Sequence, residues 1–281
     1  MNVGPGRPLA ILCGGGEFPF AVAAAAKANG RAPLMIGVEG SADRRVEAFE
    51  HAWVHMGQIG RLFALLKSHA IADLAIIGSM TRPEWGELRL DWGAVSRATR
   101  LAPMFRGGDN ALLVGIAGVF EDEGLKIVGA HEIAPQLLCP SGAIGAIRPD
   151  AQAQEDAARG AALVGALSPF DAGQAAVVAQ GRVIAVEAAE GTDAMLERVA
   201  QMRAANRLRF KGRAGVLVKA PKRGQDMRFD LPAAGPKTIE AAARAQLQGV
   251  ALAAGKTLIA DRAALAAVAD AAGIFVIGLA L

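Results

Sequence analysis

The sequence is poor in the residues that define several protein classes. Its 281 residues include two cysteines, no tyrosine and an aromatic fraction of only 5%. Cys13 and Cys139 are too few for a disulfide scaffold, and they lack the spacing of a metal site. So few aromatic side chains also argue against a surface that stacks single-stranded nucleic acid. We therefore expect neither a small disulfide-rich fold nor a nucleic-acid partner.

The chain also lacks long uncharged apolar runs. A membrane-spanning helix needs about 18 consecutive apolar residues, and no such run is present. The Gly- and Pro-rich residues 1–8 lead directly into an apolar strand, so we expect no signal peptide. Apolar residues nevertheless make up 53% of the chain, which excludes a disordered protein. These features predict a cytoplasmic globular protein of one large domain or two ordinary ones.

Charge is unevenly distributed along the chain. Residues 1–140 carry 13 basic and 14 acidic side chains, whereas residues 141–281 carry 17 and 13. Between Arg198 and Gln225 the sequence has several Lys and Arg residues but no Asp or Glu. Such a run is typical of a solvated face, and it also suits an anion site or a surface that meets acidic lipid or nucleic acid. Phe210 is the only aromatic residue in the run, which disfavours single-stranded nucleic acid.

The first half alternates short apolar segments with helical patterns. The expected strands are 8–13, 34–38, 53–56, 74–77 and 126–128, and the expected helices are 20–29, 42–50, 59–69, 92–101 and 110–123. Repeated strand–helix units indicate a parallel sheet with helices on both faces. We therefore predict an α/β fold whose first domain, residues 1–134, is Rossmann-like and binds a nucleotide.

The second half has the pattern of a mixed α/β domain. Two strand pairs, 175–179 with 183–187 and 250–253 with 257–260, are predicted to form hairpins. Asp261 precedes a helical segment as a plausible cap. Proline and glycine cluster in residues 135–150, which we interpret as a linker. Residues 151–281 would then form the second domain, a mixed α/β domain.

A glycine turn follows the first predicted strand. Gly14, Gly15 and Gly16 precede a helix, and such a turn can bring backbone amides and a helix N-terminus close to a phosphate. The spacing is not that of the dinucleotide fingerprint, so a tight structural turn stays an alternative. Arg82 follows the fourth predicted strand, at the sheet edge where open α/β sheets bind ligands. An arginine there could bind a phosphate.

Two patterns that suggest nucleotide or metal chemistry are incomplete. The segment 254–257 resembles the end of a phosphate-binding loop, but Val250 stands where its first glycine would be needed. His51 and His55 are four residues apart without a nearby third ligand, and His69 and His131 are isolated. We interpret all four histidines as structural or surface residues.

Two polar segments of the second half carry the strongest signal. Glu190-Gly191-Thr192-Asp193 lies where a strand leads into a helix, and residues 225–230 follow the strand that ends at Lys219. In an extended conformation Asp226, Arg228 and Asp230 would project to one side. Carboxylates together with substrate phosphates hold Mg²⁺, and basic side chains neutralise phosphoryl charge. A solvated edge strand with salt bridges is the alternative.

Several short motifs, taken in order, are shared with one family. They are Gly14-Gly15-Gly16 with Phe18-Pro19, the segment 78–83, the segment 107–113, Glu190-Gly191-Thr192-Asp193, the segment 225–232, Gly235-Pro236 and Thr238. With them the sequence resembles, nearly end to end, the LpxI-type UDP-2,3-diacylglucosamine pyrophosphatases of lipid A biosynthesis.

The resemblance implies a hydrolase that depends on Mg²⁺, or on Mn²⁺ in its place. It would cleave the pyrophosphate of UDP-2,3-diacylglucosamine by water attack on the β-phosphorus, releasing UMP and 2,3-diacylglucosamine 1-phosphate (lipid X). It further implies two α/β domains with the lipid held between them, of which the second, residues 151–281, would carry the catalytic and lipid-binding residues. It also implies a peripheral location at the inner face of the inner membrane of a Gram-negative cell. Whether the protein is a monomer or a homodimer stays open.

The resemblance also assigns residues. Asp226 matches the critical aspartate of the family. We expect Asp226, Asp193 and Arg228 to be catalytic, and Asp226 and Glu190 to hold the metal. The expected substrate-binding residues are Gly14, Gly15, Gly16, Arg82, Thr192, Lys219, Lys222 and Gln225, of which the glycines and Arg82 would hold the uridine nucleotide.

The chain departs from the family pattern at two places. It has Lys222-Arg223-Gly224 where a Lys-Pro step is expected, and Asp109-Asn110 where two aspartates are expected. We therefore assign no role to Arg223 and do not expect Asn110 to be a ligand. The motifs of calcineurin-like phosphoesterases are also missing, which implies a different type of catalyst.

Two alternatives belong to other functional classes. A non-enzymatic protein could bind a nucleotide sugar or a lipid in the same cleft as a sensor, and it would then release no UMP. A nicotinamide-dependent oxidoreductase is disfavoured, because the glycine fingerprint and an acid placed for the ribose are both missing.

Overall fold

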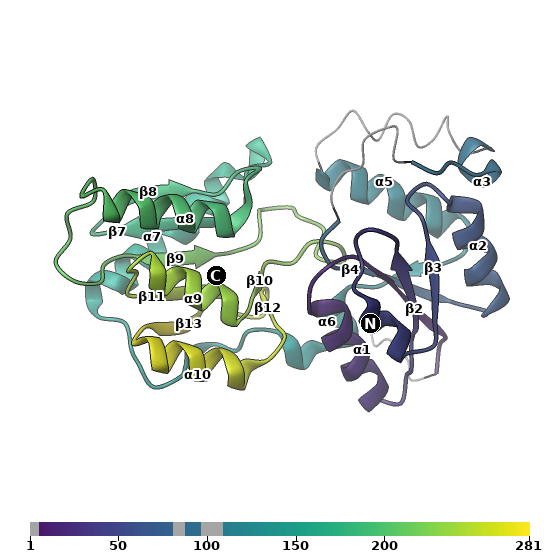
Figure 1. The fold of residues 1–281 in the computed structure, drawn as a ribbon, viewed down its shortest axis with the longest axis horizontal. Helices are drawn as coiled ribbons and strands as arrows, with labels where there is room; N and C mark the ends of the chain where they lie inside the picture. Colours follow the sequence, from purple (N-terminus) through teal and green to yellow (C-terminus); the bar gives the residue numbers. More distant parts are fainter. Residues whose placement is uncertain (1–5, 81–87, 97–108) are drawn as a thin grey trace. The chain divides into compact units, whose positions relative to one another are not determined.

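The computed structural model describes residues 6–80, 88–96 and 109–281, and the chain divides into two compact units (Figure 1). Unit 1 comprises Met1–Gln136 together with Asp226–Asp230, and unit 2 comprises Leu137–Gln225 and Leu231–Leu281. The sequence placed Asp226 in the second domain by its position along the chain. In the structure its segment belongs to unit 1, because Phe229 packs against the apolar core of that unit.

Unit 1 is built on a parallel sheet with the strand order β3-β2-β1-β4-β5. Its elements are β1 (Leu9–Cys13), α1 (Phe18–Ala28), β2 (Leu34–Val38), η1 (Arg44–Ala48), β3 (His51–Val54), α2 (Ile59–Ser68), β4 (Asp73–Ile77), α3 (Trp92–Ser96), α5 (Asp109–Asp122), β5 (Lys126–Ile127), α6 (Ala130–Ile133) and η4 (Pro135–Leu137). Every residue of β1, β2 and β4 is buried, as expected of central parallel strands covered on both faces.

Helices cover both faces of this sheet (Figure 1). Leu62 and Leu66 of α2, with Phe120 of α5, pack with Leu12 and Ile36 from the sheet in one apolar cluster. Helices α1 and α6 lie together, and α1 also contacts β1. The predicted Rossmann-like parallel sheet with helices on both faces is therefore confirmed.

One predicted element of unit 1 is wrong and another is only partly described. Residues 42–50 were expected to form an α-helix, but they contain the short 3-10 helix η1. The Asp43 carboxylate accepts the Arg45 N–H at 2.8 Å and so starts a tight turn, and β3 begins at His51, which leaves no room for a longer helix. Of the helix expected over 92–101, the structure describes α3; residues 97–101 lie outside the described part.

Unit 2 contains a mixed six-stranded sheet with the order β6-β13-β11-β9-β7-β8. Its elements are β6 (Gly142–Ile144), α7 (Ala151–Leu167), η5 (Ser168–Phe170), β7 (Ala175–Ala179), β8 (Arg182–Val186), α8 (Gly191–Ala204), β9 (Val216–Lys219), β10 (Ala233–Ala234), α9 (Pro236–Arg244), β11 (Gly249–Ala253), β12 (Leu258–Ile259), α10 (Arg262–Ala272) and β13 (Phe275–Leu279). Strands β13, β11 and β9 are parallel, and β7–β8 forms the predicted antiparallel hairpin.

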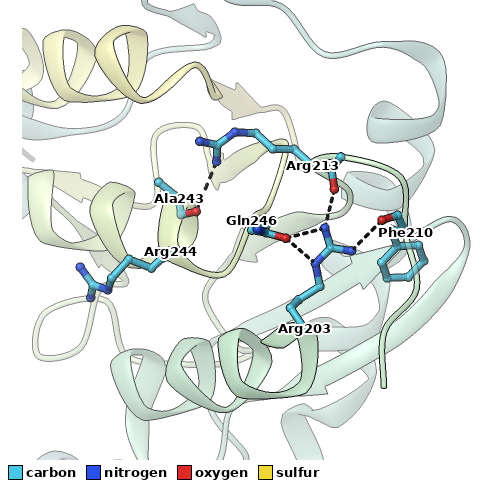
Figure 2. A pocket seen from close by; sticks show the side chains of 7 residues that line it. Arg203, Phe210, Arg213, Ala243, Arg244 and Gln246 are labelled. Carbon is cyan, nitrogen blue, oxygen red and sulfur yellow. Dashed lines mark hydrogen bonds between the residues drawn. The ribbon is translucent and has the colours of Figure 1, made fainter. Parts of the chain in front are cut away.

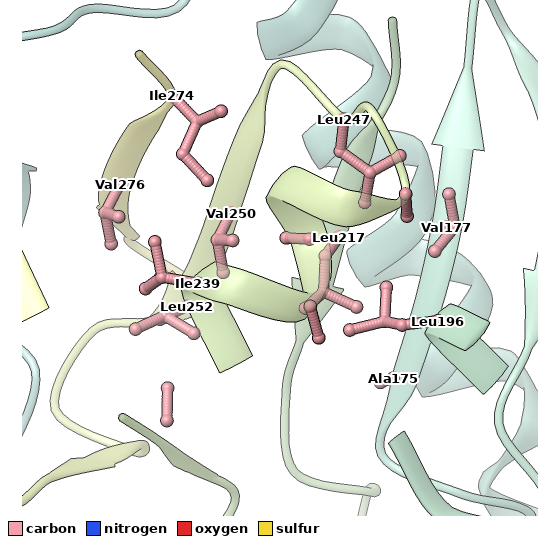
Figure 3. Close-up of a cluster of buried hydrophobic side chains, with 14 of the residues drawn as sticks. Ala175, Val177, Leu196, Leu217, Ile239, Leu247, Val250, Leu252, Ile274 and Val276 are labelled. Atoms are coloured by element: carbon pink, nitrogen blue, oxygen red, sulfur yellow. The ribbon is translucent and has the colours of Figure 1, made fainter. Parts of the chain in front are cut away.

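The two faces of this sheet carry different helices. Leu217 and Val250 point into a large apolar cluster with Leu196 of α8, Ile239 of α9 and Leu265 of α10 (Figure 3). The alternate residues, such as Val216 and Val218 of β9, pack against Ala153 and Ala157 of α7 on the opposite face. Because successive side chains of β9 point to opposite faces of the sheet, they contact both helix layers. Helix α7 lies on one face, and helices α8, α9 and α10 lie on the other.

The second predicted hairpin is wrong. β12 pairs in parallel with β10 instead of antiparallel with β11. After the turn at Lys256, Leu258 donates its N–H to Pro232 O at 2.8 Å, and Cys139 donates to Thr257 O at 2.8 Å, so the chain leaves β11. Residues 142–144 of the predicted linker form β6, an edge strand antiparallel to β13. Among the described residues, no helix is both long and apolar enough to span a bilayer.

Candidate active site

Several loops of unit 1 meet at the edge of the sheet that is formed by the carboxyl ends of its parallel strands. β1 lies between β2 and β4, so chain order reverses there, and ligands of open α/β sheets bind at such switch points. The glycine turn follows β1, and Ser79 follows β4. Gly129 follows β5, and a methyl group on it would lie 3.0 Å from the Cα of Arg228. The segment Asp226–Asp230 therefore packs at this edge, although it comes from far along the sequence.

The glycine turn is tied to the loop after β4. Gly14 donates its N–H to Ile77 O at 2.9 Å, and Gly15 exchanges two backbone hydrogen bonds with Ser79 at 2.8 and 3.0 Å. A methyl group on Gly14 would collide with the Ser79 carbonyl oxygen, so this close approach requires glycine. The N–H groups of Gly14 and Gly15, two of the three that were predicted to bind phosphate, therefore already donate to backbone carbonyl oxygens of the protein. Of the three glycines, only Gly16 keeps the predicted role in phosphate binding.

The segment around Asp226 is a turn and not an extended strand. Phe229 donates its N–H to Asp226 O at 3.2 Å, and the Asp226 carboxylate accepts the Arg228 N–H at 3.0 Å. The prediction that Asp226, Arg228 and Asp230 project from an extended stretch is therefore wrong. An aspartate that bonds the backbone two residues ahead favours a turn, which is the physical reason for the difference.

The turn nevertheless brings Asp226 and Arg228 together. The Arg228 guanidinium donates to both carboxylate oxygens of Asp226 at 2.7–3.1 Å and, through Nη1, to Glu121 of α5 at 2.6 Å. Hydrogen bonds from the Arg228 side chain hold the pKa of the Asp226 carboxyl below its usual value, against the opposing effect of burial, and His131 adds a smaller lowering. The pKa of Arg228 is raised by the same contacts. Asp226 is therefore an anion at neutral pH.

Glu121 is a site residue that we did not identify from the sequence. It lies in the last turn of α5, where a carboxylate meets the negative end of the helix dipole and is unfavourable. Its contact with Arg228 compensates for that placement. In the sequence, Glu121 could have been singled out because it begins an acidic triplet, residues 121–123.

The two predicted metal ligands belong to different units. Asp226 is part of unit 1, whereas Glu190 is part of unit 2, where it accepts from Arg198 at 2.9 Å and from the Ala188 N–H at 3.2 Å. The described residues contain no cluster of three or more His, Cys, Asp or Glu side chains that could hold a metal ion. Mg²⁺ is often held by one or two carboxylates plus substrate phosphates. The ionised Asp226 is a ligand of that chemical type, but both of its oxygens accept hydrogen bonds from Arg228 in this structure.

A second polar cluster lies in unit 2, at the end of β9. Lys219 donates through Nζ to Thr192 Oγ1 at 2.9 Å, and the Thr192 hydroxyl donates to Glu187 Oε1 at 2.8 Å. Glu187 also accepts the Gln174 N–H at 2.7 Å. Lys219 and Glu187 are each only 9% exposed. The structure thus brings the predicted residues Thr192 and Lys219 together and adds Glu187, an acid at the end of an apolar strand pattern that we had not singled out.

The remaining predicted residues of unit 2 have separate contacts. Asp193 is exposed on the first turn of α8. The Lys222 ammonium forms an ion pair with Asp171 at 2.5 Å, and the Lys222 N–H donates to Gln225 Oε1 at 2.9 Å. Arg223 donates its N–H to Ser168 Oγ at 2.7 Å. Arg82 lies outside the described residues, and so do the side chains of Asp109 and Asn110.

Neither cysteine is suited to nucleophilic catalysis. Burial raises the pKa of the Cys13 thiol to about 12 and that of Cys139 to about 11. A reactive cysteine needs a thiolate, which an electropositive and accessible environment favours. The candidate groups are therefore oxygen and nitrogen groups, and they lie in two separate clusters. Asp226, Arg228 and Glu121 form one cluster in unit 1, and Lys219, Thr192 and Glu187 form another in unit 2.

Comparison with known proteins places both units in known families of domains. Residues 8–137 match the LpxI N-terminal domain, and residues 140–277 match the LpxI C-terminal domain. A curated relative, the UDP-2,3-diacylglucosamine pyrophosphatase LpxI of Caulobacter vibrioides, is 38% identical over 273 residues, which cover 97% of this chain and 98% of the relative.

Proposed function

Because the chain belongs to the LpxI family, we propose that it hydrolyses the pyrophosphate of UDP-2,3-diacylglucosamine. The products are UMP and 2,3-diacylglucosamine 1-phosphate, and water attacks the β-phosphorus. The name of the Caulobacter relative and the match along nearly the whole chain support this reaction class. In this proposal the protein acts in lipid A biosynthesis, at the inner face of the inner membrane.

The observation that carries the proposal is the ionised Asp226 held by Arg228 at the switch point of a Rossmann-like sheet. In the proposed reaction, Asp226 binds the metal or orients the attacking water. Mg²⁺, or Mn²⁺, when bound would neutralise phosphoryl charge and orient the pyrophosphate. Arg228 lies beside Asp226 and adds positive charge where negative charge develops.

The unit 2 cluster supplies a second set of groups in the proposal. Lys219 contributes a fixed positive charge for a phosphate, and Thr192 holds its ammonium at 2.9 Å. Lys222 and Gln225 form the turn that follows β9 and bind the substrate, and Asp193 and Glu190 assist at the start of α8. The Gly16 amide and Arg82 bind the nucleotide. The nearly complete burial of Lys219 favours a specific role over a solvated one.

The experiment measures UMP release from UDP-2,3-diacylglucosamine in mixed micelles. It compares the wild type, Asp226→Asn and the control Glu155→Gln, which removes an exposed carboxylate of α7. We expect Asp226→Asn to lose at least about 100-fold in rate and the control to retain full activity. Full activity of Asp226→Asn would remove this residue from the mechanism, and full activity in excess chelator would remove the metal. Binding of the nucleotide lipid without any UMP would indicate a sensor.

A further inference from the structure

A basic groove lies in unit 2 at the edge where β9 and β11 begin. It has a volume of about 490 Å³, and its lining includes Arg203, Phe210, Arg213, Arg244 and Gln246 (Figure 2). Arg203 comes from the last turn of α8 and Arg244 from the last turn of α9, while residues 210–213 lead into β9. Lys219 stands at the other end of β9, so the groove is separate from the Lys219–Thr192–Glu187 cluster.

Two guanidinium groups of the groove are held in place by neutral acceptors. Arg203 donates to Gln246 Oε1 at 2.9 and 3.2 Å and to the carbonyl oxygens of Phe210 and Gly212. Arg213 donates to Ala243 O at 3.3 Å (Figure 2). These contacts order the side chains but cancel none of their charge.

Besides Arg203 and Arg213, three cations belong to this basic region. Arg244 lines the groove, Arg209 and Lys211 line the adjoining hollow, and all three are exposed. Within the described part of the chain, no carboxylate forms an ion pair with these three side chains or with Arg203 and Arg213. Five positive charges that have no ion-pair partner among the described residues therefore gather at one edge of the sheet, in the half of the chain that carries the excess of basic residues.

We propose that this basic groove docks unit 2 on an anionic lipid surface. The inference rests on the proposed function, since a substrate with two acyl chains has to be met at such a surface. Clusters of four to eight Lys and Arg side chains bind anionic headgroups, with an affinity that falls steeply with salt. Phe210 is the only aromatic side chain in the lining, which disfavours a single-stranded nucleic acid as the occupant.

The position of the groove fits a docking role and not a catalytic one. β9 has four residues, so its two ends are about 10 Å apart at ~3.3 Å per residue. Docking at the groove therefore holds the Lys219 end of the strand close to the lipid surface without covering it. Removing the outer cations should weaken association with the membrane and leave chemistry on a dispersed substrate intact.

The test uses the full chain and sedimentation with vesicles of phosphatidylcholine alone or mixed with phosphatidylglycerol. The variant combines Arg209→Gln, Lys211→Gln and Arg244→Gln, which leave the ordered Arg203 and Arg213 in place. The matched control combines Lys27→Gln, Arg159→Gln and Arg182→Gln, three exposed cations outside the groove. Each headgroup contact contributes about 5-fold in affinity, so the groove variant should bind anionic vesicles about 100-fold more weakly than the wild type.

Three further results complete the expectation. The wild type should bind anionic vesicles and not neutral ones, binding should vanish near about 1 M salt, and the groove variant should release UMP from micellar substrate at the wild-type rate. The proposal would be overturned if the wild type and the groove variant bound anionic vesicles equally well. It would also be overturned if the control variant lost as much vesicle binding as the groove variant, or if the wild type bound RNA more tightly than anionic vesicles. No UMP from the wild type in micelles would instead contradict the proposed reaction, while the vesicle data still decide the docking surface.

Discussion

Glu187 is the buried residue whose substitution tests the unit 2 cluster most directly. Glu187→Gln keeps the size of the side chain but removes its charge. The carboxylate accepts two hydrogen bonds, from Thr192 Oγ1 at 2.8 Å and from the Gln174 N–H at 2.7 Å, and glutamine offers one acceptor oxygen for both. A hydrogen bond to a charged group contributes about 1.5–3 kcal/mol, so the loss of one predicts a decrease of about 2 kcal/mol in the free energy of unfolding.

The same substitution should affect catalysis through the Thr192–Lys219 contact. If the glutamine NH₂ faces Thr192, the hydroxyl loses the acceptor for its proton, and the Lys219 ammonium loses a nearby negative charge. Displacement of these groups by about 1 Å can reduce a rate by about 100-fold, so we expect UMP release to fall by about 10- to 100-fold at saturating substrate.

Urea denaturation and UMP release measure the two effects. Glu197→Gln on the exposed face of α8 is the matched control, and surface changes of this kind stay within about 0.5 kcal/mol of the wild type. If Glu187→Gln unfolds within that same margin, the Glu187–Thr192–Lys219 chain of hydrogen bonds does not stabilise unit 2. If it is destabilised but releases UMP at the full rate, the cluster is structural only.

The glycine turn and the Asp226 turn yield two further predictions. Gly14→Ala places a methyl group against the Ser79 carbonyl oxygen and should lower the free energy of unfolding by about 1–3 kcal/mol. The control Gly118→Ala places its methyl group in open space beside α5 and should not lower the free energy of unfolding. Equal urea midpoints for the two variants would show that the approach of Gly14 to Ser79 does not require glycine. Arg228 lowers the pKa of Asp226 in the folded state. The pair therefore stabilises the protein at pH values above the pKa of an aspartate in the unfolded chain, about 3.9. This stabilisation is lost as the pH falls through the lower pKa of the folded state. The urea midpoint of Asp226→Asn should therefore decline less than that of the wild type between neutral pH and about pH 3, and parallel declines would show that the pair contributes nothing.

Local patterns made much of the fold predictable. The central strands β1, β2 and β4 are buried on both faces, so they are apolar throughout and can be recognised from their own residues. Asp261 marks the start of α10 because its carboxylate caps the Ala264 N–H at 2.8 Å, an interaction within four residues of chain.

The mistaken elements show where local reasoning ends. The pattern of residues 257–260 suits a strand, but its pairing with β10 instead of β11 depends on backbone partners at Pro232 and Cys139. The Asp226 segment has alternating polar and apolar residues, yet the carboxylate bonds its own backbone and forms a turn. In both cases a competing hydrogen-bond partner decided the outcome, and periodicity does not reveal such partners.

The sequence by itself determined the α/β class, the parallel first sheet and the family to which the motifs point, because these follow from short-range periodicity and from residues in a fixed order. Only the tertiary structure decided that Asp226 and Arg228 belong to unit 1, and that Glu121 pairs with Arg228 across 107 residues of chain. It also decided that two of the three glycine amides are used within the protein. The physical reason is that packing of Phe229 and ion pairs between charged side chains join segments whose proximity no local pattern encodes.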